Sequence, residues 1–266
     1  MGKLLEKFMA IVALIGSSTQ NVRAQQTARP ADIDLAAITA RGRALAAYDQ
    51  AAWHATDAVQ TANPKAAQGQ PYLARFENDG WTVVFGYLNP NKTKFLITYE
   101  TTQDSKPQVF KVSHNDPPKE DAGYFLFAAR ALEAVLSDFE RPSRPYNSAV
   151  LPAADNQLYV YLYPAQLKAG VYPLGGDVRY LVSADGRNIL EKRQLHKFII
   201  EPKAAPASAK KAGGNHIHAG SDFPEDTDVL HVLQQDPHLP EIVNTPHFTY
   251  EIMPDGSITI RREKKK

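Results

Sequence analysis

The chain has 266 residues, of which 43% are hydrophobic, so it is long and apolar enough to bury a large core. Its formal net charge is +1, and it contains no cysteine. These values exclude a disordered protein, a disulfide scaffold and cysteine-ligated zinc, and they predict no charged field that would attract nucleic acid.

Residues 1–24 have the pattern of a signal peptide. Lys3 and Lys7 lie in a charged start, the apolar run FMAIVALIGSS follows it, and VRA precedes Gln25. The apolar run is too short for a membrane-spanning helix, which needs about 20 residues. We therefore expect export with cleavage after Ala24, and a periplasmic or secreted mature protein without a transmembrane span. Cleavage would remove three basic residues and one acidic residue, so the formal net charge would fall from +1 to −1.

Residues 25–69 are expected to form a polar connector and then one long helix. The alanine-rich run that follows Asp34 contains no proline until Pro64, and Asp34 is suited to cap its first turn. Asn63-Pro64 predicts the end of the helix. The remaining residues, 70–262, are expected to form an α+β domain that carries a histidine motif near its C-terminal end.

The hydrophobic period changes from helical to alternating after this helix. Residues 71–100 predict antiparallel strands, and residues 107–114 predict a further strand that ends at NDPPKEDAG. Residues 121–139 predict a second long helix that begins at Asp121, and residues 148–201 predict several more strands. A short helix and a closing hairpin follow the histidines. The order of elements predicts a single-domain α+β fold with a mainly antiparallel sheet, two longer helices and one short helix.

The strongest chemical signal is the stretch GGNHIHAGSDFPEDTDVLHVL, residues 213–233. If NHIH is extended, the His216 and His218 side chains leave the same side of the strand and can reach one ion. Nearby aspartates and glutamates offer further oxygen donors for zinc. The alternative is that this polar, glycine-containing segment is a solvated loop.

The residues HIHAGSDFPEDTDVLHVL resemble the metal-binding motif of the JAB/MPN domain, the fold of zinc-dependent isopeptidases. His216 and His218 match the two motif histidines, and Asp228 falls at the motif aspartate. The resemblance implies that these three residues bind zinc, with Glu225 or Asp226 beside them, and that the chain hydrolyses amide or isopeptide bonds.

Two positions depart from that motif. Ala219 stands at the motif proline, and Glu225 stands where a serine would stabilise an oxyanion, which a carboxylate would repel. The resemblance also implies a glutamate base on an earlier strand, for which Glu191 is the first candidate and Glu201 the second. Glu225 is a further candidate for the base.

The whole chain also resembles exported bacterial proteins of unassigned function, in which RPYNSAVLPA, YPLGGDVRYLVSADGR and the HxH stretch occur together. This second resemblance implies no activity. Two hypotheses therefore remain, a zinc-dependent hydrolase and a non-catalytic binding or structural module of the cell envelope.

Overall fold

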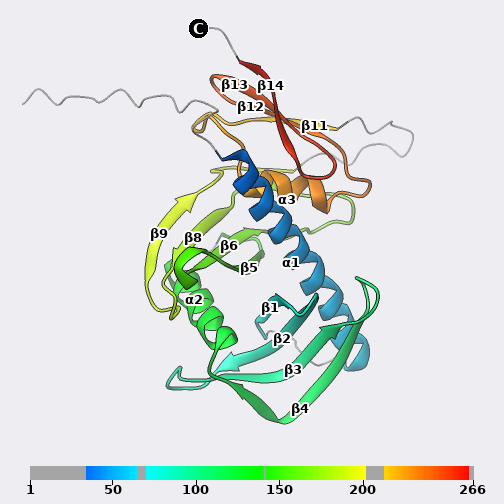
Figure 1. Ribbon diagram of the computed structural model, residues 1–266, viewed down its shortest axis with the longest axis vertical. Coiled ribbons are helices and arrows are strands. Elements are labelled where there is room, and N and C mark those ends of the chain that lie inside the picture. Colours follow the sequence, from blue (N-terminus) through cyan, green and yellow to red (C-terminus); the bar gives the residue numbers. More distant parts are fainter. Residues whose placement is uncertain (1–33, 65–69, 141, 202–212, 264–266) are drawn as a thin grey trace, which may run out of the picture.

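The computed structural model describes residues 34–64, 70–140, 142–201 and 213–263 (Figure 1). Within these ranges the chain forms three α-helices, three four-stranded sheets and one two-stranded sheet, which confirms the predicted α+β class. The expected signal peptide and most of the loop before the histidines lie outside the described residues. None of the described helices is long and apolar enough to cross a membrane.

The elements follow the chain in the order α1 (Leu35–Ala62), β1 (Tyr72–Glu77), β2 (Gly80–Leu88), β3 (Phe95–Gln103), β4 (Phe110–Asp121), α2 (Tyr124–Asp138), β5 (Tyr146–Pro152), η2 (Ala154–Asn156), β6 (Leu158–Pro164), β7 (Leu174–Gly175), β8 (Val178–Val182), β9 (Ile189–Gln194), β10 (Ile199–Ile200), β11 (Gly214–Ile217), α3 (Asp226–Gln234), β12 (Glu241–Asn244), β13 (Phe248–Ile252) and β14 (Ile258–Glu263).

The three larger sheets have simple strand orders. β1-β2-β3-β4 and β5-β6-β8-β9 are antiparallel throughout, as the alternating sequence pattern predicted. In the third sheet, β11-β12-β13-β14, β11 is parallel to β12 because α3 connects the two strands. β7 and β10 pair with each other and form the two-stranded sheet.

Helix α1 connects the two ends of the molecule. Figure 1 shows it running from the β11–β14 sheet to the β1–β4 sheet. The side chain of Asp34 accepts a hydrogen bond from Ala37 N at 2.8 Å, which confirms the predicted cap. α1 packs against α3 at Gly42, where a Cβ atom would collide with Val229. The missing side chain therefore allows the close approach of the two helices.

Helix α2 begins at Tyr124, three residues after the predicted start at Asp121, which is the last residue of β4. The Asp121 carboxylate accepts hydrogen bonds from Gly123 N and Leu126 N, each at 3.0 Å. The buried face of α2 packs with β1, β2, β5 and β6, so one apolar cluster fills the space between the first two sheets. A second cluster surrounds α1, and a third joins α1 and α3 to the β11–β14 sheet.

Strand β4 is longer than the sequence pattern predicts. We expected the strand to end at NDPPKEDAG, but β4 continues to Asp121. Pro117 and Pro118 are accommodated because β4 is the edge of its sheet and because the pairing with β3 is interrupted between His114 and Lys119. A missing proline N–H therefore removes no ladder hydrogen bond there.

Candidate metal centre

Four side chains from three parts of the sequence meet at one point. His196 follows β9, His216 lies on β11, His218 follows β11, and Asp228 lies in the first turn of α3. One potential ligand atom from each of the four lies within 4.8 Å of the others. The structure thus brings His216, His218 and Asp228 together and adds His196.

The extended backbone of β11 explains why the two motif histidines face the same way. His216 pairs with Val243 of β12, and His218 N continues the ladder by donating to Asn244 O at 2.8 Å. The Nε2 atoms of the two imidazoles lie 3.1 Å apart. Both residues are buried, with exposed fractions of 6% and 5%, so the solvated-loop interpretation is wrong.

Asp228 is held by the start of α3. Its Oδ2 atom accepts a hydrogen bond from Glu225 N at 2.7 Å, which completes a capping box with the Glu225 side chain. Its Oδ1 atom is buried and has no hydrogen-bond partner among the described residues. That atom lies 3.2 Å from His196 Nε2 and 3.1 Å from His216 Nε2.

The opposite ring nitrogen of each imidazole faces an oxygen acceptor. His196 Nδ1 lies 2.7 Å from Asp177 Oδ1, and His216 Nδ1 lies 2.8 Å from Glu241 Oε1. His218 Nδ1 lies 3.0 Å from the Phe223 carbonyl oxygen. These acceptors assign the ring proton to Nδ1 in the neutral histidines, so each Nε2 atom presents a lone pair.

Three imidazole lone pairs and one carboxylate oxygen therefore point at a common space. His196 Nε2 is 2.8 Å from His218 Nε2. At this distance two nitrogen lone pairs repel each other unless a proton or a cation lies between them. Ligand atoms about 2.1 Å from a tetrahedral ion lie about 3.4 Å apart, close to the separations found here. The donor set and its geometry fit a transition-metal ion.

The charges of the cluster are strongly coupled. Burial, the largest influence, lowers the pKa of His196, but Asp228 and Asp177 outweigh it and raise this pKa to about 11. Burial also lowers the pKa of His216, and Asp228 and Glu241 raise it to about 9. These shifts show that the carboxylates favour positive charge at this point, which either protons or a metal ion can supply.

The three candidate bases occupy different environments. Glu201 is exposed, pairs with Arg144 and is not part of the cluster. Glu191 lies on β9, is exposed and is not part of the cluster. Glu225 is buried at the N-terminus of α3, and its Oε1 atom accepts from Arg193 Nη2 at 2.6 Å. Burial raises the pKa of Glu225 to about 8, against the lowering effect of Arg193.

Asp226 has a different role from the one expected. It is fully buried and binds Arg41, Arg179 and the Tyr161 hydroxyl, and within the described part of the chain no hydrogen bond or ion pair joins it to the four clustered side chains. Because Arg41 lies on α1 and Arg179 on β8, Asp226 joins α3 to both elements. This network fixes the N-terminal turn of α3, which carries Asp228.

A pocket of about 520 Å³ opens onto the cluster. Its lining includes His196, His216, His218 and Glu225, so three of the four clustered side chains border this pocket, whereas Asp228 is fully buried behind them. Phe198 and Ile217 also line it and are 81% and 74% exposed. Large apolar side chains exposed beside a polar site are typical of surfaces that bind another molecule.

Sequence reasoning missed His196 and the three acceptors that orient the imidazoles. The available signal was weak, because His196 is a single histidine after a strand, 20 residues before His216. Comparison with protein-family models, curated proteins and solved structures finds no match to the chain.

Proposed function

We propose that this protein binds one divalent transition-metal ion, with zinc as the best-suited ion, through His196, His216, His218 and Asp228. The observation that carries the proposal is the convergence of three Nε2 atoms on the buried Asp228 carboxylate. His196 and His216 face its Oδ1 atom at 3.2 and 3.1 Å, and His218 faces its Oδ2 atom at 3.3 Å. Zinc accepts imidazole nitrogen and carboxylate oxygen in this number. The acceptors behind each ring would hold the ligands in place and strengthen binding.

Calorimetric titration with Zn²⁺ near pH 7 tests this proposal. We expect wild type to bind one ion, and we expect His218→Ala and Asp228→Ala to weaken binding by orders of magnitude because the coordination shell is incomplete. His247→Ala is the matched control, since His247 pairs with Asp222 outside the cluster. Equal affinities for all variants, or no site tighter than about micromolar, would contradict the proposal.

A second candidate function is zinc-dependent hydrolysis of an amide or isopeptide bond. It is supported by the pocket that reaches the cluster and by the JAB/MPN resemblance of the residues on β11 and α3. Bound zinc would polarise a carbonyl group and lower the pKa of a water molecule. His196 is a fourth protein donor where the resemblance implies water, so hydrolysis requires an ion that accepts a fifth ligand, as catalytic zinc can.

Two of the three candidate bases, Glu225 and Glu191, give a direct test of hydrolysis. Zinc-loaded protein is assayed with a fluorogenic peptide that contains an acylated lysine ε-amine, before and after treatment with a chelator. We expect Glu225→Gln to abolish cleavage and the exposed Glu191→Gln to leave it unchanged, because Glu225 lines the pocket with the ligands. Zinc binding without cleavage of this peptide would instead favour the non-catalytic binding module.

We further propose that the protein is exported after cleavage at Ala24. The charged start, the short apolar run and the VRA sequence support this. Mass spectrometry of cell-envelope and extracellular fractions should detect a chain that begins at Gln25. A full-length chain found in the cytosol would contradict export.

A further inference from the structure

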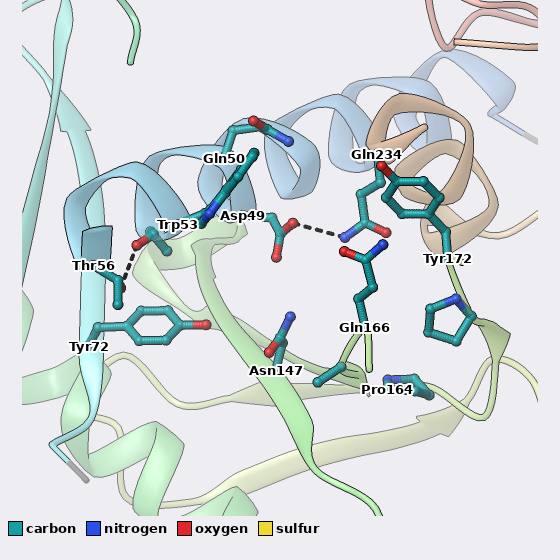
Figure 2. A pocket seen from close by; sticks show the side chains of 13 residues that line it. Asp49, Gln50, Trp53, Thr56, Tyr72, Asn147, Pro164, Gln166, Tyr172 and Gln234 are labelled. Atoms are coloured by element: carbon teal, nitrogen blue, oxygen red, sulfur yellow. Dashed lines mark hydrogen bonds between the residues drawn. The ribbon is translucent and has the colours of Figure 1, made fainter. Parts of the chain in front are cut away.

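A second cavity, away from the clustered histidines, lies between α1 and the strands (Figure 2). Its volume is about 360 Å³, within the usual range for small-molecule sites. Residues of α1 form one side, and Asn147 of β5 and Gln166, which follows β6, lie opposite. Gln234, the last residue of α3, lies at the edge of the space.

Asp49 is the one charged residue in the described lining of this cavity. Its Oδ1 atom accepts from the Tyr163 hydroxyl at 2.7 Å, and its Oδ2 atom accepts from Gln234 Nε2 at 2.8 Å. Both donors are neutral, so they do not balance the carboxylate charge. Burial raises the pKa of Asp49 despite these two hydrogen bonds, which shows that the charged form is poorly compensated.

The other lining groups suit a ligand that is polar at one end and apolar at the other. Figure 2 shows the Asn147 and Gln166 amides reaching toward Asp49 and Gln234 from the strand side. Among the described residues, no hydrogen bond occupies the Asn147 or Gln166 side chain. Tyr72 and Tyr172 lie on opposite sides of the space, and Trp53 on α1 adds a third aromatic ring that is 56% exposed.

We propose that this cavity binds a small organic cation, an ammonium compound whose charge is held by Asp49 and by the surrounding aromatic rings. A carboxylate and several aromatic rings around one space are the chemistry that recognises ammonium groups. An anionic ligand would be repelled, since the described lining contains no lysine or arginine. A neutral sugar would use the amides but would leave the Asp49 charge uncompensated.

Choline and its uncharged isostere, in which carbon replaces the nitrogen, are the probes for this proposal. Calorimetry or ligand-observed NMR with the full chain compares the two at pH 7. We expect choline to bind about tenfold or more tightly than the isostere, equivalent to about 1.4 kcal/mol. Asp49→Asn should remove this difference while keeping an oxygen acceptor for Tyr163. Asp57→Asn, an exposed aspartate on the same helix, should leave it unchanged.

A second variant and a pH series protect the test from a folding artefact. Trp53→Ala changes an exposed side chain and should weaken choline binding severalfold. The affinity for choline should rise as pH rises through the pKa of Asp49, because Asp49 is then the group that changes charge. Choline does not titrate, and the facing Tyr163 and Tyr72 hydroxyls stay neutral because burial raises their pKa values. Equal affinities for choline and its isostere would overturn the proposal. Binding of glucose, with no binding of choline or its isostere, would overturn it as well.

Discussion

Replacing Asp226 by alanine should destabilise the protein more than any exposed ion pair can explain. The Asp226 carboxylate is fully buried and accepts from Arg179 at 2.6 Å, from Tyr161 at 2.8 Å and from Arg41 at 2.9 and 3.0 Å. The variant leaves the Arg179 guanidinium, whose side chain is only 10% exposed, without its counter-ion. Breaking a buried pair in this way costs about 3 to 5 kcal/mol.

That loss is a large share of a total stability of about 5 to 15 kcal/mol. In a domain of this size, each kcal/mol lowers Tm by about 2 to 4 °C, so Asp226→Ala should lower Tm by about 6 to 20 °C. Differential scanning calorimetry should be run in a chelator, because Asp226 lies in the same helical turn as Asp228. Loss of a metal ion then cannot account for the shift.

Glu133→Ala is the matched control for this experiment. Glu133 on α2 pairs with Lys92 at 2.6 Å, but the two side chains are about half exposed. Such pairs contribute about 0 to 1 kcal/mol, so Tm should fall by a few degrees at most. If both variants shift Tm by the same small amount, the conclusion that the Asp226 network holds α3 against α1 and β8 is wrong.

Three further predictions follow from particular contacts. Gly42→Ala should lower the free energy of unfolding, measured by urea titration, by about 1 to 3 kcal/mol, because the added Cβ atom collides with Val229. This loss is expected although alanine favours helices, so a more stable variant would contradict the packing. Glu241→Ala should weaken Zn²⁺ binding by about 10-fold to 100-fold, since it removes the acceptor that orients the His216 ring, and unchanged affinity would refute that role. Burial raises the pKa of Asp49, so the protonated side chain favours the folded state. This contribution to stability is present below the unfolded-state pKa of about 4 and is lost as pH rises through the folded-state pKa. Asp49→Asn should therefore gain stability relative to wild type over that pH interval. Parallel stability curves for the two proteins would show that Asp49 is not perturbed.

Local signals predicted most of the fold. Asp34 caps α1, and Asp121 accepts from Leu126 N in the first turn of α2, so their roles involve residues only a few positions away and follow from short sequence patterns. Alternating hydrophobicity likewise predicted the antiparallel strands. The extension of β4 through Pro117 depended on its place at a sheet edge, which no local pattern reveals.

The candidate site was predicted only where its residues are close in the sequence. His216 and His218 lie on one extended segment, and Asp228 follows in the next helix, so spacing was informative. His196 follows β9 and joins them across 2.8 Å to His218, and the orienting acceptors Asp177 and Glu241 come from still other parts of the chain. These contacts depend on how the sheets pack, which single-sequence periodicity does not encode.

The most direct test of the account is zinc X-ray absorption spectroscopy of wild type and His196→Ala, because His196 is the donor that the structure adds to the motif. For wild type, we predict one zinc ion with scattering from three imidazole rings and one oxygen ligand at about 2.0 to 2.2 Å. For His196→Ala, we predict two imidazole rings and a compensating oxygen ligand. Identical spectra for the two proteins, or zinc surrounded by oxygen alone, would contradict the proposed centre.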